Sequence, residues 1–438
     1  MRACFPDRVP DRLSASDSDL ALYLDSATLD RGGRTQTLAV REARLTLPAG
    51  EGPGCVHYRV DLKASLTDTW DGPGGRALDA VLVSPHLFLW APPEGLTGAT
   101  LTFDLPPGLA ISAPWPAVGE GEGTRFKIGG RPLDWDARVA IGRFEQFAIA
   151  VAGGRLDVAL LRGDPPALRG RIEPWLHANA AALSLALDPA TPRLPVSRLQ
   201  VLVVPLGKGG EPIPWGQVMR GGGDAVHLYI DQTRPQAEFL ADWVLIHELS
   251  HLLHPYTSGD GPWLYEGIAS YYQNLLPARA GSRDELDTWE HLHAGFRRGI
   301  KGTKPGQSLT QASGDMLRER GFMRVYWSGA AFALLADLEL RRASGGVQSL
   351  GWALGELRRR FGPFDRAWEP REVVEALDQV SGGRVFGDLY RRWLPSDRFP
   401  DLTDAYRRLG LEAIDDTRLR LSDDPKAAAL RGSLVGGR

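Results

Sequence analysis

Two histidines and a glutamate lie close together in the segment His247-Glu248-Leu-Ser-His251. On a helix, residues four apart share a face, about 6 Å apart along the axis, so both imidazoles can bind one ion at roughly 2.0–2.1 Å. Glu248 lies beside the first histidine, where its carboxylate can reach a water molecule on that ion. This spacing is typical of zinc sites that activate water for hydrolysis. The alternative is two hydrogen-bonded histidines inside a packed helix.

A third ligand is expected from the next helix, which begins near Trp263 after a loop rich in glycine and proline. Glu266 lies in its first turn, and 14 residues separate it from His251. An antiparallel return would bring this carboxylate to both histidines. Two histidines, one carboxylate and one open position are the coordination of a catalytic zinc, so we expect one Zn²⁺ per chain. His254 lies about 10 Å from His247 along the axis, too far to share the ion.

The segment that must hold these residues follows a long stretch with the pattern of strands. The runs either alternate polar and apolar residues or are short and wholly apolar. They are 57–63, 81–83, 87–90, 100–105, 147–152 and 156–161. Short strands separated by glycine and proline predict an all-β sandwich over residues 1–166.

The pattern changes after residue 166 and predicts a mixed and then helical domain over residues 167–398. Its α/β part, 167–254, would hold a helix over 172–187, buried strands over 199–205 and 225–230, and the helix that carries the two histidines. Residues 255–398 are almost wholly helical in pattern. Residues 399–438 are expected to form a C-terminal tail, with one short helix over 405–409 and a loosely held polar end.

Bulk composition excludes several classes of function. A net charge of -3 gives no reason to expect nucleic acid as a partner. Two cysteines, Cys4 and Cys55, are too few for a disulfide scaffold or a cysteine-rich zinc module. No stretch approaches the roughly 20 apolar residues of a transmembrane segment. The first residues lack an apolar secretory core, so the chain as given is expected to be soluble and cytoplasmic, or periplasmic if a leader was removed.

Three blocks of sequence resemble the gluzincin metallopeptidases. Residues 247–251 read His-Glu-Leu-Ser-His, and residues 263–272 read Trp-Leu-Tyr-Glu-Gly-Ile-Ala-Ser-Tyr-Tyr. Residues 325–346 are similar to the Tyr-x-x-Gly-Ala helix of the aminopeptidase N and glycyl aminopeptidase families. The resemblance extends over about residues 195–365. It implies a thermolysin-like catalytic domain with zinc on the two histidines and the second-helix glutamate.

The resemblance also implies further site residues. Tyr326 would donate a hydrogen bond to the oxyanion, since a phenol with a pKa near 10 stays protonated at neutral pH. In the aminopeptidases a Gly-x-x-Glu segment on the strand before the zinc helix binds the substrate amino terminus. Here that place reads Arg220-Gly-Gly-Gly-Asp, so substrate binding is assigned to Gly222, Gly223 and Asp224, with Asp224 in place of the glutamate.

The sequence therefore predicts a zinc-dependent peptidase that acts on peptide or protein substrates, with Glu248 as the general base. Two alternatives stay open. One is a gluzincin relative that hydrolyses a different bond, such as an epoxide. The other is a catalytically degenerate relative that serves as a peptide-binding or protein-binding module. Oligomeric state and cleavage preference have no signal in the sequence.

Overall fold

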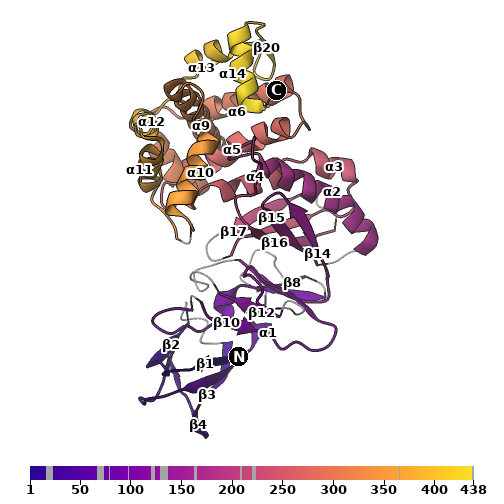
Figure 1. The fold of residues 1–438 in the computed structure, drawn as a ribbon, viewed down its shortest axis with the longest axis vertical. Coiled ribbons are helices and arrows are strands. Elements are labelled where there is room, and N and C mark those ends of the chain that lie inside the picture. The colour runs from indigo at the N-terminus through magenta and orange to yellow at the C-terminus, as the bar shows by residue number, and fades with distance from the viewer. Residues whose placement is uncertain are drawn as a thin grey trace.

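A computed structural model shows sheets at the N-terminal end of the molecule and helices at the C-terminal end (Figure 1). It describes residues 1–436 except 16–22, 67–73, 78, 97, 120–123, 129–136, 162–164, 208–209, 220–222 and 365. Among the described helices we find none with the length and apolar character that crossing a bilayer requires. The arrangement of sheets followed by helices agrees with the multidomain prediction.

Antiparallel sheets build the N-terminal part, with strand orders β1-β7-β3-β4, β2-β6-β5, β11-β13-β9-β8 and β10-β12. The strands are β1 (Arg2–Phe5), β2 (Arg12–Ser14), β3 (Leu24–Arg31), β4 (Arg34–Thr37), β5 (Val40–Arg41), β6 (Arg44–Thr46), β7 (Gly54–Val60), β8 (Gly74–Ala77), β9 (Ala80–Val83), β10 (Thr100–Thr102), β11 (Ala110–Ser112), β12 (Arg125–Lys127) and β13 (Val139–Gly142), with one short helix, α1 (Leu62–Ser65). One apolar core contains Leu13 and Leu45, and another contains Trp115 and Val139. The alternating side chains of these strands supply both cores.

The predicted strand over residues 87–90 is wrong. A 3-10 turn, Pro85–Leu87, and an irregular segment take its place. The backbone N–H of Leu87 donates to the Ser84 carbonyl, and that of Phe88 donates to the Pro85 carbonyl. The apolar run is buried as expected, but proline at its start favours a turn over an extended strand.

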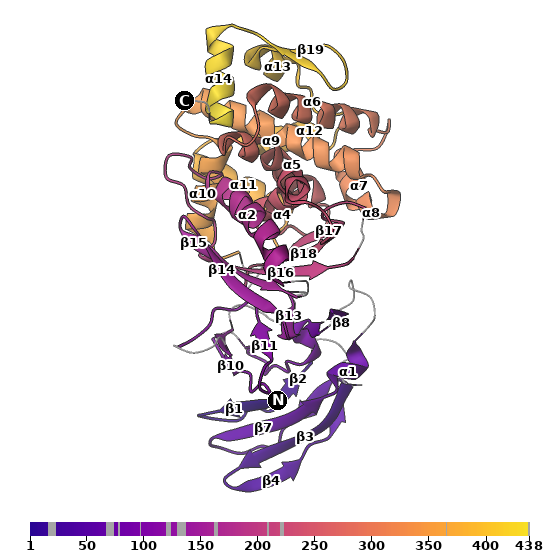
Figure 2. The ribbon, with the colours of Figure 1, turned by 90° about the vertical axis from the view of Figure 1, so that its right-hand side faces the viewer.

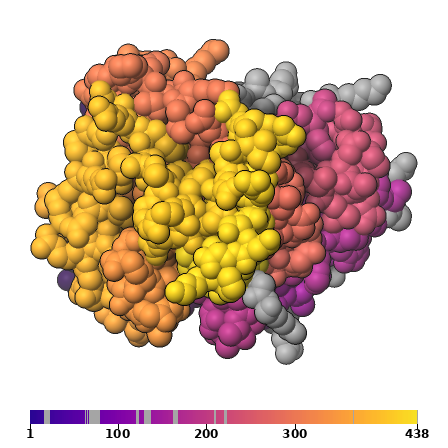
Figure 3. Space-filling model, turned by 90° about the horizontal axis from the view of Figure 1, so that it is seen from above, coloured from indigo at the N-terminus to yellow at the C-terminus, as the bar shows by residue number. Residues whose placement is uncertain are grey.

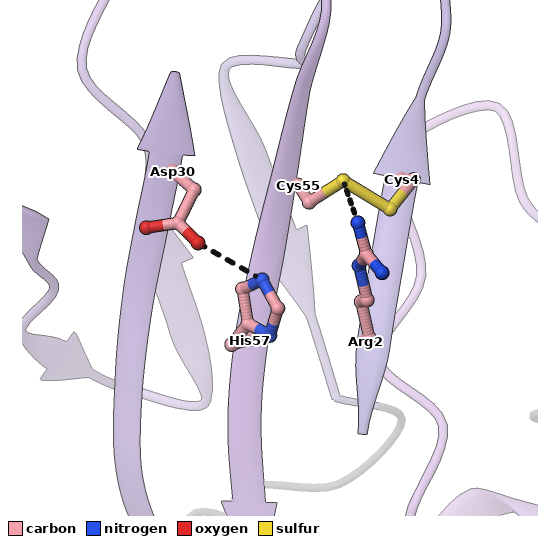
Figure 4. Close-up of a disulfide and its surroundings, with 5 residues drawn as sticks. All are labelled: Arg2, Cys4, Asp30, Cys55 and His57. Atoms are coloured by element: carbon pink, nitrogen blue, oxygen red, sulfur yellow. Dashed lines mark hydrogen bonds and ion pairs between the residues drawn. A yellow bond between two sulfur atoms is a disulfide. The ribbon is translucent and has the colours of Figure 1, made fainter. Parts of the chain in front are cut away.

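Cys4 and Cys55 form a disulfide that joins β1 to β7 at directly opposed positions of the sheet. The Arg2 guanidinium lies 3.6 Å from the Cys55 sulfur. His57 of the same strand pairs with Asp30 of β3 at 3.1 Å (Figure 4). The bond closes a separation of 51 residues. Nothing in the sequence pairs two cysteines so far apart, because only the strand register brings them together.

A five-stranded sheet forms the base of the C-terminal part, with order β14-β15-β16-β18-β17. Its strands are β14 (Glu145–Val151), β15 (Gly154–Leu160), β16 (Arg198–Pro205), β17 (Trp215–Met219) and β18 (Ala225–Ile230). β15, β16 and β18 are parallel, and β17 is an antiparallel edge strand. The β14–β15 hairpin, which the sequence assigned to the first domain, extends this sheet instead. β17 was not predicted, because Trp-Gly-Gln-Val-Met shows no clear alternation of polar and apolar residues.

Helices cover one face of this sheet, and the N-terminal part covers the other. Figure 2 shows α2 (Pro165–Ser184) and α4 (Val244–Ser250) between the sheet and the helices above it. Leu82 and Ala140 of the N-terminal sheets pack against Leu202 and Tyr229 on the opposite face. Coverage on both faces explains why β16 and β18 are almost entirely apolar.

The rest of the chain is mostly helical, as predicted. The helices are α3 (Gln236–Ala241), α5 (Pro262–Arg279), α6 (Glu285–Lys301), α7 (Leu309–Gly314), α8 (Met316–Glu319), α9 (Phe322–Ser344), α10 (Leu350–Phe361), α11 (Pro370–Ser381), α12 (Val385–Trp393), α13 (Thr403–Leu409) and α14 (Pro425–Val435). Two short strands, β19 (Leu411–Ala413) and β20 (Leu419–Leu421), pair near the end. α5 and α9 are buried along most of their length and form the centre of this part.

The expectation of a loosely held C-terminal tail is wrong. Figure 3 shows the last residues spread over the face of the helical part. Arg431 of α14 is buried, donates to the carbonyls of Leu409 and Ser422, and pairs with Glu285 of α6 at 2.9 Å. Leu434 is also fully buried. The segment is polar partly because it carries this arginine, which is buried together with its partners. Its polar composition therefore does not indicate a mobile end.

α5 and α9 approach each other closely at two glycines. A Cβ on Gly329 would lie 1.8 Å from the Trp263 carbonyl oxygen, and one on Gly267 would lie 2.4 Å from the Gly329 Cα. Only glycine leaves room for backbones at this separation. The contact fixes the relative position of the residues on either side of it, including the predicted ligand Glu266.

Gly329→Ala should lower the free energy of unfolding by about 3 kcal/mol, because the added methyl group must push two helix backbones apart. Gly170→Ala is the matched control, since its Cβ would meet nothing within 4 Å on the exposed side of α2. That change should gain about 0.5–1 kcal/mol from helix propensity. Denaturant unfolding measures both, and equal effects of the two substitutions would contradict the close helix contact.

Candidate metal centre and active site

The helix that carries the two histidines is short and is preceded by a break. Residues 236–254 form α3, a break at Asp242, then α4 and a 3-10 turn, His251–Leu253. Asp242 is extended, with φ -74° and ψ 144°, and its carboxylate accepts a hydrogen bond from the Val244 N–H at 2.7 Å. Burial raises the pKa of Asp242 to about 6. The break starts a new helix one turn before His247 and sets the direction in which its ring points.

Three predicted ligands converge on one point. The Nε2 atoms of His247 and His251 lie 3.0 Å and 3.6 Å from the Glu266 carboxylate. One ligand atom from each residue falls within a cluster no wider than 4.8 Å, and both histidines are buried. The chain therefore returns through α5 so that Glu266 meets both histidines. Two nitrogens and one oxygen that face one another match the donor set of a catalytic zinc site.

Glu248 of α4 faces β17, the edge strand of the sheet. Its carboxylate oxygen accepts a hydrogen bond of 3.0 Å from the backbone N–H of Val218 in β17. This bond ties the position of the carboxylate to the edge strand. Gly216 permits this approach, because a Cβ there would lie 2.9 Å from Glu248 Cγ and 2.8 Å from Val244 Cγ1.

Tyr326 extends from the start of α9 over the cluster. Its ring stacks nearly parallel to the His247 ring, with centroids 6.0 Å apart and an interplanar angle of 9°. Burial raises the pKa of the phenol, and the charge and hydrogen bond of Glu266 raise it further. The phenol therefore stays protonated at neutral pH and can act as a hydrogen-bond donor.

No family model and no curated protein matches the sequence. An aminopeptidase N family protein from Idiomarina loihiensis has a similar structure, with a TM-score of 0.66, 18% identity, and coverage of 97% of this chain and 79% of its own. The chain has the aminopeptidase N-like fold.

Two structures of an M1 zinc metallopeptidase from Deinococcus radiodurans also match. The first has a TM-score of 0.51 and 16% identity, covering 92% of this chain and 88% of its own. The second is a mutant bound to a Tyr-Ser-Ala substrate, with a TM-score of 0.50, 15% identity and the same coverage. The likeness runs through both the β-rich and the helical parts of the aminopeptidase N-like fold.

Two of the three predicted substrate residues, Gly223 and Asp224, have contacts that the structure describes. Gly222 is outside the described residues. A Cβ on Gly223 would lie 2.4 Å from the Pro114 carbonyl oxygen of the N-terminal part, and the carbonyl of Asp224 accepts the Gln200 N–H. The Asp224 carboxylate acts on the buried Arg358 guanidinium. The Gly223 contact lies at the junction between the two parts of the chain, whereas the Asp224 contacts lie within the C-terminal part. Substrate binding by these residues stays a prediction.

Gly216 and Val218 of β17, which contact Glu248, were not predicted as site residues from the sequence. A glycine inside a short strand often marks close approach of another group, and this signal was present. His254 does not join the cluster: its Nδ1 lies 2.8 Å from the Pro255 carbonyl. His227 is buried, accepts the Arg138 N–H, and has a pKa lowered to about 3, chiefly by burial.

The raised pKa of His247 makes metal binding depend on pH. Burial lowers the pKa of its imidazole, but the hydrogen bond and charge of Glu266 outweigh burial, so the pKa is raised. Below the ordinary histidine pKa of about 6.5, the protonated ring and Glu266 stabilise the metal-free fold. This contribution is lost as the pH rises through the raised pKa. Zinc needs the neutral ring, so its binding strengthens over the same range.

The increase in melting temperature caused by zinc should therefore grow from about pH 5 to about pH 8. Thermal unfolding of the metal-free protein with and without added zinc measures this increase. Glu266→Gln is the control, because it removes an anionic ligand and the partner of His247. An increase of the same size at every pH in the unaltered protein would contradict the proton–metal competition.

Gly216→Ala should reduce the turnover expected of a zinc hydrolase by about 10–100-fold without loss of bound metal, because the atoms nearest to the added methyl group belong to Val244 and Glu248. Gln217→Ala is the control, since this side chain is exposed on the same strand. Turnover and zinc content are measured together. Unchanged turnover in Gly216→Ala would show that the close approach of β17 does not position Glu248.

Proposed function

We propose that the chain is a zinc-dependent metallopeptidase that hydrolyses peptide bonds. The observation that carries the proposal is the convergence of His247, His251 and Glu266, with Glu248 held beside them by the edge strand. We assign one zinc ion to the three ligands. Zinc bound there would lower the pKa of a water molecule and polarise a carbonyl group.

The chain's own residues supply the proton transfers and hold the substrate. Glu248 accepts a proton from the attacking water and returns it to the leaving amine. The bond from the Val218 N–H to one carboxylate oxygen supports this role, because it holds the side chain next to His247. The Tyr326 phenol donates a hydrogen bond to the oxyanion, a role that suits its raised pKa.

The edge strand β17 supports a peptide as the substrate. An extended peptide can pair with the exposed side of an edge strand, which places its backbone beside Glu248. The Tyr-Ser-Ala substrate of the Deinococcus radiodurans mutant is a short peptide of this kind. β17 itself, Trp215–Met219, has no acidic side chain to bind a substrate amino group. We therefore propose a peptidase without assigning cleavage at the amino terminus.

The proposal includes the finer points of architecture. The N-terminal part acts as a β-sandwich domain, and the remainder is a thermolysin-like catalytic domain. Continuity of the five-stranded sheet favours a boundary just before β14, earlier than the boundary at residue 166 that the strand pattern predicts. The helical layer from residue 255 onward completes the catalytic domain.

Glu248→Gln should retain zinc and lose hydrolysis by about 10²–10⁴-fold, because the amide keeps the side-chain volume but cannot accept the proton. The assay incubates a peptide library with the zinc-loaded protein and maps the cleaved bonds by mass spectrometry. The same maps distinguish cleavage at chain ends from cleavage at internal bonds.

Glu238→Gln provides a matched control, since this glutamate on α3 forms a partly exposed ion pair with Arg234 and lies outside the metal cluster. It should cleave the library as the unaltered protein does. A zinc-loaded unaltered protein that cleaves no peptide would overturn the proposed activity. Full activity in Glu248→Gln would remove that residue from the mechanism.

A further inference from the structure

The His247 ring is held at both of its nitrogens by side chains of α5. Its Nε2 lies 3.0 Å from the Glu266 carboxylate, and its Nδ1 lies 2.6 Å from the Gln273 amide oxygen. Gln273 follows Glu266 by seven residues, which is about two helical turns, so both side chains extend from one face of α5. One helix therefore determines where this ring sits and how it is turned.

The direction of the hydrogen bond decides which nitrogen can bind a metal. The Gln273 carbonyl oxygen is an acceptor, so the Nδ1 atom of His247 must carry the proton and donate it. In the neutral ring the lone pair then belongs to Nε2, the atom that faces Glu266 and His251, and a metal bound there takes the place of the proton that Nε2 shares with Glu266 in the metal-free protein. With the amide reversed, the proton would sit on Nε2 and block coordination, so a bound metal requires the arrangement in which the amide oxygen faces the ring.

We propose that Gln273 is a positioning residue for the metal site: it fixes the tautomer and orientation of His247. The proposal rests on the proposed function, since it assumes that the cluster binds zinc. Metal-binding histidines commonly donate their second N–H to a carboxylate, a carbonyl or water, and loss of that partner weakens metal binding. Here the partner is a neutral amide, so the ring is oriented without a third carboxylate beside Glu248 and Glu266.

The neighbouring residue on α5 offers a matched comparison. Asn274 also has an amide side chain, but it is buried and donates to the Ser270 carbonyl of its own helix at 2.8 Å. It has no bond to His247. Loss of the Asn274 amide tests what α5 packing contributes, whereas loss of the Gln273 amide tests orientation of the ligand.

Gln273→Ala should weaken zinc binding by about 10–100-fold. Competition with a chromophoric chelator measures the dissociation constant, and the visible spectrum of the cobalt-substituted protein reports on ligand geometry. Asn274→Ala should leave the zinc dissociation constant unchanged, even if it lowers the melting temperature. Gln273→Glu supplies an oxygen acceptor at the same place and should restore affinity to at least that of the unaltered protein.

The outcomes separate this inference from the proposed function. If the unaltered protein binds no zinc, the proposed function fails. If it binds zinc tightly and Gln273→Ala binds equally tightly, only the role of Gln273 fails. A loss of affinity in Gln273→Glu as large as that in Gln273→Ala would also overturn the role, because the acceptor oxygen would then not be what matters.

Discussion

The contact on which the site depends is the close approach of two helix backbones, where Gly329 of α9 lies against Trp263 of α5 with no room for a side chain. Glu266 lies one turn beyond Trp263, and Tyr326 lies one turn before Gly329. A separation larger by one methyl group would move the carboxylate and the phenol away from each other and from His247. Glycine here sets the distance between functional groups that belong to different helices.

A second close approach joins the site to the sheet. Gly216 of β17 lets the edge strand reach Glu248, and the Val218 N–H then fixes one oxygen of the carboxylate. The break at Asp242 sets the start of α4, so that the helix faces this strand. β17, α4, α5 and α9 therefore meet at one point. Gly216 and Gly329 permit the close contacts there, and a larger residue at either position would disturb them. Positioning of this kind is what water activation and oxyanion binding require.

The parts of the site that sequence could predict are those set by local geometry. His247 and His251 share a helix face by spacing alone, and Glu266 needs only a short return loop. The contacts of Gly216 and Gln273 could not be found in this way, because they depend on strand order and on the rotation of α5. The seven-residue spacing from Glu266 to Gln273 was a usable signal, but only after a metal site had been assumed. The Cys4–Cys55 bond and the packed C-terminal helix likewise depend on long-range register.

Electrostatics gives a reason to assign a cation rather than a structural histidine cluster. Burial lowers the pKa of the His247 ring and raises the pKa of the Tyr326 phenol. Glu266 and Glu248 raise the pKa of both groups. Two carboxylates and two buried imidazoles at one point are costly to enclose unless positive charge is added. A divalent ion bound there would supply that charge, and protonation of His247 would supply part of it in the metal-free protein. Proton and metal would then compete for the same nitrogen, and the neutral amide of Gln273 would orient the ring without adding to the negative charge.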